Sequence, residues 1–105
     1  MIDIEQKYLD MVLQLIEQFV PQCEVWAYGS RVNGTSHRSS DLDLVIRNPA
    51  DLEKSLPAIN DLKIATGESN IPLIIDILDW ARTPEHFRRE ILNSPYQIIA
   101  GRVEK

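Results

Sequence analysis

Apolar residues recur at helical spacing at the start of the chain and fall into short β-forming runs further on. The first series runs from about Ile4 to Phe19, and its steps of three and four place the apolar side chains on one face of a predicted helix. Asp3 is the expected N-cap of this helix, and Gln6, three residues later, completes a capping box. Pro21 marks the end of the helix.

Two short strands are predicted next, with a polar segment between them. Residues 23–28 (CEVWAY) are rich in β-forming residues, and Gly29 breaks the run. Residues 41–47 (DLDLVIR) form the second run, which the following Asn-Pro pair ends. The segment between the strands is turn-forming, and a short helix beginning near Ser30 fits there.

The next segment predicts one helix and one strand. Residues 50–69 are helical in character, but Pro57 argues against a single straight helix. We therefore expect a helix that restarts near Pro57 and ends near Gly67. Residues 71–79 (IPLIIDILD) predict a third strand, which is apolar enough to lie in the middle of a sheet.

A last helix and a last strand complete the pattern. Thr83 is the expected cap of this helix, with Pro84 at its first position, and residues 96–99 predict a short edge strand. Helices and strands alternate along the chain, which predicts an α/β (α+β) fold with a small sheet covered by helices. The pattern leaves open which strands are parallel.

Length, charge and cysteine content narrow the class of protein. A chain of 105 residues forms one domain, residues 1–105, with little left for a separate recognition domain. The net charge of −5, from 11 Lys and Arg against 16 Asp and Glu, argues against direct nucleic-acid binding. Cys23 is the only cysteine, so an intrachain disulfide and a thiolate zinc cluster are excluded. With no secretory signal and no apolar run of about 20 residues, the chain is expected to be cytoplasmic and to have no membrane span.

Asp41 and Asp43 are the first candidates for chemistry. Alternate residues of a strand point to the same side, so these two carboxylates share a face while Leu42 points into the core. Two carboxylates held together repel each other unless a cation lies between them, and Mg²⁺ typically binds one or two carboxylates together with substrate phosphates. Taken alone, the pair is equally consistent with a solvated strand face.

Asp76 is the third candidate, because it interrupts the apolar run of the third predicted strand. A carboxylate in that setting is expected to be at least partly buried, and burying it without a partner costs several kcal/mol. The partner is a metal shared with Asp41 and Asp43, an Arg or Lys such as Arg82 or Arg47, or a set of backbone donors.

Gly29 and Ser30 follow a strand and open a predicted helix. Glycine lets the backbone approach a ligand closely, and N–H groups at a helix start favour phosphate. Arg31, Arg38 and Ser40 lie in or beside this segment, and Arg31 and Ser40 complete the predicted nucleotide-binding set. Taken alone, Gly-Ser is more often an ordinary turn and helix cap.

Together these residues carry a resemblance. The Gly-Ser pair, ten intervening residues and then Asp-Leu-Asp resemble the motif of the DNA polymerase β-type nucleotidyltransferase superfamily. The surrounding text, YGSRVNGTSHRSSDLDLVI, is similar to that of its smallest members, the minimal nucleotidyltransferases. A third carboxylate occurs in a later strand of that family, at the position of Asp76, and the similarity covers about residues 8–99.

The resemblance implies a polymerase β-like palm and a set of roles. Gly29 and Ser30 would hold the β- and γ-phosphates of a nucleoside triphosphate, with ATP as the expected donor. Asp41 and Asp43 would bind two Mg²⁺ ions, and Asp76 would bind one of them and help to deprotonate the acceptor hydroxyl. The implied reaction transfers AMP and releases pyrophosphate.

The resemblance also implies a partner. Minimal nucleotidyltransferases are typically encoded beside a small helical protein of the HEPN class, often an RNase toxin. In such pairs the nucleotidyltransferase is the antitoxin, and some members transfer AMP to a tyrosine of the partner. A chain this short leaves its site open, so a homodimer or a hetero-oligomer with the partner is expected to close it.

Two alternatives remain beside this reading. The chain could be a non-catalytic antitoxin that neutralises its partner by forming a complex. It could also modify an aminoglycoside, but such enzymes of the superfamily usually carry a further domain for the drug, for which 105 residues leave little room.

Overall fold

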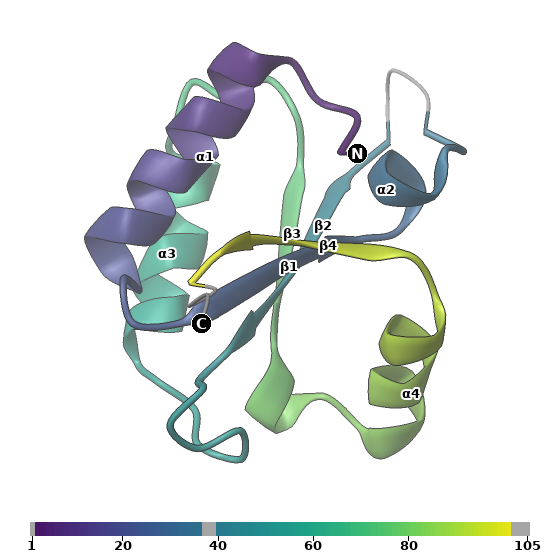
Figure 1. Cartoon of the computed structure of the whole chain (residues 1–105). Coiled ribbons are helices and arrows are strands. Elements are labelled where there is room, and N and C mark those ends of the chain that lie inside the picture. Colours follow the sequence, from purple (N-terminus) through teal and green to yellow (C-terminus); the bar gives the residue numbers. More distant parts are fainter. Residues whose placement is uncertain (1, 37–39, 102–105) are drawn as a thin grey trace.

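A computed structural model describes residues 2–36 and 40–101 of the chain. Its elements follow one another in an alternating order (Figure 1), as the sequence predicts. In chain order they are α1 (Gln6–Phe19), β1 (Glu24–Tyr28), α2 (Ser30–Asn33), β2 (Leu42–Arg47), α3 (Ala58–Gly67), β3 (Ile75–Asp79), the 3₁₀ helix η1 (Trp80–Arg82), α4 (Glu85–Asn93) and β4 (Tyr96–Ala100). None of the described helices has the length and apolar character needed to cross a membrane.

The four strands form one mixed sheet in the order β3-β2-β1-β4. Strand β1 pairs with β2 and with β4 in antiparallel fashion, whereas β2 and β3 are parallel. The mixed sheet covered by helices confirms the predicted fold class. The edge position of β4 was predicted correctly, but the central position expected for the third strand is wrong, because β3 lies at the other edge.

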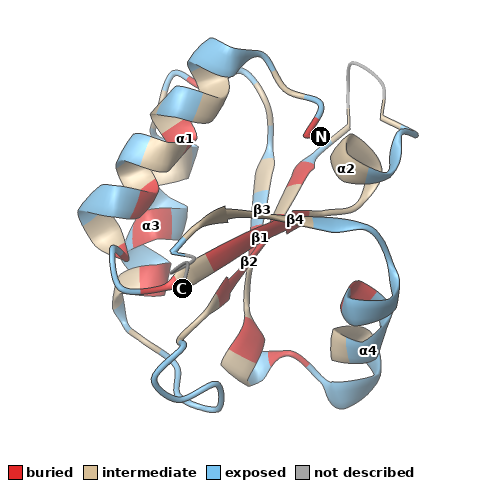
Figure 2. Cartoon of the chain, viewed as in Figure 1, coloured by how far each residue is buried: buried red, intermediate tan, exposed pale blue. Residues whose placement is uncertain are grey.

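Helices cover the sheet on two sides. Helices α1 and α3 lie on one side, and α4 lies on the other (Figure 1). The larger core, on the α1 and α3 side, contains Val12, Leu44 and Leu62, and buried residues concentrate in β1 and β2 (Figure 2). Burying these apolar side chains removes them from water, which is the main favourable contribution to folding. The two central strands are therefore the most firmly held part of the fold.

A smaller core on the other side is built around two tryptophans. Trp26 of β1 and Trp80 of η1 are both buried. The Arg47 guanidinium lies 4.2 Å from the Trp26 ring centroid and 4.6 Å from that of Trp80, and it also pairs with Glu24 at 3.4 Å. Cation–π contacts of this kind are most stabilising where they are shielded from water. Both tryptophans therefore serve to pack this core.

The start of α1 differs from the predicted capping box. The N-cap is Glu5, without a side-chain hydrogen bond, and the Gln6 amide donates to Asp10 at 2.8 Å. Asp3 instead joins the α2 region: its N–H donates to the Arg31 carbonyl at 2.6 Å, and its carboxylate accepts from the Ser36 hydroxyl. Asp3 therefore forms hydrogen bonds with residues distant in the sequence and does not cap α1.

The helical character expected for the residues before Pro57 is also wrong. Asn48 and Asp51 accept backbone N–H groups two residues ahead, at 3.1 and 3.0 Å, and so form turns there. Such side-chain bonds offer the backbone an alternative to a helix. Helix α3 begins directly after Pro57 and ends at Gly67, as predicted.

The third strand and the last helix begin later than predicted. Strand β3 starts at Ile75 rather than at residue 71, since Ile71 and Pro72 belong to the connection from α3. The Thr83 hydroxyl donates to the Asp79 carbonyl at 2.8 Å instead of capping α4. Pro84 is the residue before α4, with an extended backbone, and not its first helical residue.

Candidate nucleotidyl-transfer site

Four side chains form a row across the sheet at one end of the strands. Asp43 of β2 is the register partner of Tyr28 in β1 and of Asp76 in β3, and Tyr28 is the partner of Tyr96 in β4. Register partners lie on the same face of a sheet. The two strands that carry the aspartates are therefore neighbours, and Asp43 lies between Tyr28 and Asp76.

The Asp43 carboxylate is the electrostatic centre of this row. It is half-buried, and its pKa is raised to about 6, first by burial and then by the negative charges of Asp76 and Asp41. A raised carboxyl pKa means that the ionised form is disfavoured where it stands. The site therefore gains from any cation that binds between these carboxylates.

Position 29 requires glycine for two reasons, its backbone conformation and the closeness of Asp43. Its φ of 81° lies in the left-handed region, and a Cβ atom added to it would overlap the Asp43 carboxylate. The Gly29 carbonyl accepts the N–H groups of Val32 and Asn33, both at 3.0 Å, so α2 starts directly after it. The Gly-Ser turn and the acidic strand are thus in contact, as a shared phosphate and metal site requires.

Asp41 and Asp76 flank this centre and are both exposed. The expectation that Asp76 is at least partly buried is wrong, because β3 is an edge strand and this end of it has no covering helix. Neither proposed cation pairs with it: Arg47 pairs with Glu24, and Arg82 forms no ion pair within residues 2–36 and 40–101. Asp76 is therefore an accessible carboxylate beside Asp43.

Arg31 and Ser40 are placed together near the Gly-Ser turn. The Arg31 guanidinium donates to the Ser40 carbonyl at 2.9 and 3.1 Å and to the Asp3 carbonyl at 2.8 Å. These bonds tie the segment before β2 to the start of the chain and to α2. A phosphate contact by Arg31, Ser40 or Ser30 stays a prediction, and Arg38 lies outside the described residues.

Tyr28 and Tyr96 continue the row on the other side of Asp43. Burial, followed by the charges of Asp43 and Asp76, raises the pKa of Tyr28, so its phenol stays protonated. Its ring meets Phe87 of α4 edge-on, beside a hollow of about 150 Å³ next to Gly29. Because alternate residues of a strand share a face, the sequence alone places Tyr28 on the same face as Trp26. Only the strand pairing shows that Tyr28 also lies beside the Asp43 carboxylate.

The donor set consists of carboxylate oxygens. In the part of the chain that the structure describes, no three metal-binding side chains gather closely enough to hold an ion by themselves. Mg²⁺ commonly binds to one or two carboxylates and completes its shell with water and substrate phosphates. Asp43 with an exposed carboxylate on each side suits that mode of binding better than a closed protein cage.

Comparisons with known proteins agree with this geometry. Residues 2–92 match the family model of the central palm domain of mitochondrial-like poly(A) RNA polymerase. The probable protein adenylyltransferase MntA of Haemophilus influenzae is 43% identical over 98 residues, which cover 93% of this chain and 83% of MntA. The chain belongs to the minimal nucleotidyltransferase family. The chain is accordingly a nucleotidyltransferase with a palm domain.

Solved structures show the same fold. The crystal structure of a toxin-antitoxin with AMP-PNP matches this chain with a TM-score of 0.68 and 18% sequence identity. The match covers 86% of this chain and 70% of the chain in that structure. A mutant of the toxin-antitoxin MntA-HpeT has a TM-score of 0.67 at 16% identity, with the same coverage. At these identities the likeness confirms the minimal nucleotidyltransferase fold.

Proposed function

We propose that this chain is a metal-dependent adenylyltransferase that transfers AMP from ATP to a hydroxyl of a partner protein. Its partner would be a helical toxin of the HEPN class, for which the chain would serve as antitoxin. The name of the 43%-identical relative, probable protein adenylyltransferase, supports the reaction. The toxin-antitoxin structures, one of them with AMP-PNP, support the donor and the kind of partner.

One observation carries the proposal. Asp43 and Asp76 are register partners on adjacent parallel strands, and the backbone of Gly29 lies against the Asp43 carboxylate. A phosphate bound at the Gly-Ser turn would therefore lie beside both carboxylates. No structural role inside the described chain accounts for three carboxylates, those of Asp41, Asp43 and Asp76, at one end of a sheet.

Each residue of the proposed site would have a separate role in the reaction. Gly29 and Ser30 would bind the β- and γ-phosphates, and Asp41 and Asp43 would hold Mg²⁺. When bound, the metal ions would supply charge stabilisation for the attacking and leaving oxygens. Asp76 would accept the proton of the acceptor hydroxyl as that oxygen bonds to the α-phosphorus. The bond from the α-phosphorus to the bridging oxygen breaks at the same time, and pyrophosphate leaves.

A transfer assay tests the proposal. Purified chain, Mg²⁺, ATP labelled at the α-phosphate and lysate of the source organism are combined, with an EDTA control and with GTP as a competing donor. Label should move onto one protein, only with Mg²⁺, and unlabelled ATP should compete better than GTP. Absence of label from a folded chain would favour the non-catalytic antitoxin, whose complex with the partner would survive substitution of all three aspartates.

A further inference from the structure

We propose that the free edge of β3 binds an extended acidic segment of the acceptor protein and places its hydroxyl residue opposite Asp76. The inference rests on the proposed function, which it deepens by naming where and how the acceptor binds. It combines three features of the described chain: an unpaired strand edge, the position of Asp76 on that edge, and two cations beside it.

The outer edge of β3 has free backbone groups. The Ile74 carbonyl accepts the N–H of Leu42 at 2.9 Å, so the polar groups of Ile74 face β2. Because these groups alternate along a strand, those of Ile75 and Ile77 point away from β2. None of the described hydrogen bonds outside the sheet ladder involves Ile75 or Ile77. An unpaired edge of this kind is a template for an added strand.

An added strand would continue the row of site residues. Tyr28, Asp43 and Asp76 occupy successive strands at the same register and on the same face. A residue opposite Asp76 on a further antiparallel strand would also point to that face, with its Cβ atom about 4.5–5.5 Å from that of Asp76. Its hydroxyl would then lie beside the carboxylate that is proposed to accept its proton.

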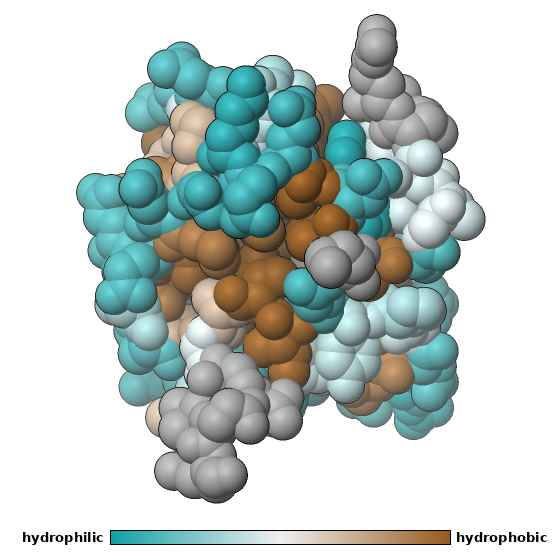
Figure 3. All heavy atoms as spheres, turned by 45° about the horizontal axis from the view of Figure 1, so that its top comes forward, coloured by the Kyte–Doolittle hydropathy of each residue, from teal (hydrophilic) through white to brown (hydrophobic). Residues whose placement is uncertain are grey.

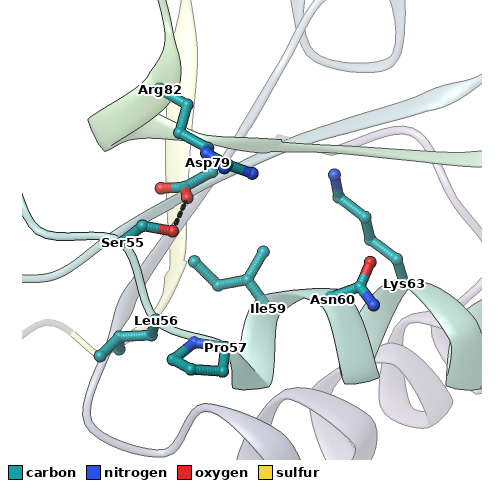
Figure 4. A pocket seen from close by; sticks show the side chains of 8 residues that line it. All are labelled: Ser55, Leu56, Pro57, Ile59, Asn60, Lys63, Asp79 and Arg82. Carbon is teal, nitrogen blue, oxygen red and sulfur yellow. Dashed lines mark hydrogen bonds between the residues drawn. The ribbon is translucent and has the colours of Figure 1, made fainter.

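Cations line two hollows between this edge and α3. Lys63 of α3 and Arg82 of η1 line a hollow of about 320 Å³ at the end of β3, and Figure 4 shows the ends of both side chains turned toward each other. Lys63 also lines a second hollow, of about 240 Å³, beside Ile74 and Ile75. The hollows thus follow the edge from the start of β3 to its end.

The charge of this groove favours an acidic occupant. Neither Lys63 nor Arg82 forms an ion pair with another described residue, in a chain whose net charge is −5. The carboxylate in the same hollow, Asp79, already accepts the Ser55 hydroxyl and the Ala81 N–H. A segment with carboxylates one and three residues from its hydroxyl residue would therefore place them beside the two free cations.

A peptide titration tests the docking without using activity. The probe is the capped heptapeptide Glu-Ala-Glu-Tyr-Glu-Ala-Glu, added to ¹⁵N-labelled chain without ATP. The amide signals of Ile75 and Ile77 should shift. The double variant Lys63→Glu/Arg82→Glu should bind at least about tenfold more weakly, since it replaces two attractions to the peptide by two repulsions. The matched double variant Lys7→Glu/Arg89→Glu changes the net charge equally but lines none of these hollows, so its affinity should stay that of the wild type.

A methylated probe tests strand addition itself. The same heptapeptide with its three central amide nitrogens methylated should not bind, because it cannot pair with the edge. Equal binding of the methylated probe, or shifts confined to other elements, would overturn the proposal. Protection of the Ile75 and Ile77 amides in a free homodimer would also overturn it, since a second copy would then cover the edge.

Failure of the docking and failure of the proposed function are separable. If peptide binds at the β3 edge but wild-type chain transfers AMP to no acceptor, the reaction is wrong and the docking stands. If AMP transfer to the partner proceeds equally well in Lys63→Glu/Arg82→Glu, the reaction stands and the docking is wrong.

Discussion

Asp43, the centre of the proposed site, lowers the stability of the fold when its carboxyl is ionised. Its pKa of about 6 exceeds the 3.8 of an unperturbed aspartate, so folding favours the protonated carboxyl. The resulting stability is present below about pH 4 and is lost as the pH rises through 6. Residues that serve a site commonly carry such a cost.

The variant Asp43→Asn should therefore be more stable than the wild type at neutral pH when no metal is present. In EDTA, the melting temperature of the variant minus that of the wild type should increase from pH 4 to pH 7 and then level off. The reason is that only the wild type acquires the negative charge of the carboxylate as the pH rises. Thermal unfolding followed by circular dichroism at several pH values measures this. A melting-temperature difference that stays constant from pH 4 to pH 7 would contradict the raised pKa.

Gly29 gives a second prediction for a single residue. Gly29→Ala should lower the free energy of unfolding by more than about 1 kcal/mol, because φ is positive and the new Cβ would overlap Asp43. Gly67→Ala is the matched control: nothing lies within 4 Å of its added Cβ, and alanine is favoured over glycine in a helix by about 0.5–1 kcal/mol. Urea unfolding of both variants should give opposite signs, and equal losses would refute the contact.

At the scale of elements, the sequence predicted β1, β2, α3 and the Gly-Ser turn well, because each has a local signal. It misplaced β3, whose apolar run suggested a central strand although Ile74 is 69% exposed. An apolar run predicts a strand but does not give the position of that strand in the sheet. Which strand lies next to it, and hence whether Asp76 is covered, depends on long-range pairing that no local pattern contains.

The small core under α4 gives a prediction at the same scale. Trp80→Ala should lower the free energy of unfolding by about 3–5 kcal/mol, since it removes a buried ring that contacts Trp26 and Arg47. Leu92→Ala in α4 is the control, because Leu92 is 47% exposed and its loss should change stability by less than about 0.5 kcal/mol. Urea unfolding compares the two, and a small effect of Trp80→Ala would show that this core contributes little.

At the scale of the whole molecule, the proposed site is open to solvent at one end of the sheet. The described chain has a sheet with a helix-covered face, a second face that α4 covers in part, and an acidic row left open at one end. Figure 3 shows, in addition, hydrophobic surface gathered near the centre of one face within a hydrophilic surround. A partner that presents a hydroxyl to Asp76 would complete the proposed site.

The measurement that tests the central claim most directly is the rate of AMP transfer in matched aspartate variants. With Mg²⁺ and α-labelled ATP, Asp43→Asn and Asp76→Asn should each slow transfer by at least about a hundredfold, because each removes charge from the reacting centre. Asp61→Asn, an exposed aspartate of α3, should transfer at the wild-type rate. Equal rates in all three variants, each shown to be folded, would mean that the Asp43 and Asp76 row is not where transfer occurs.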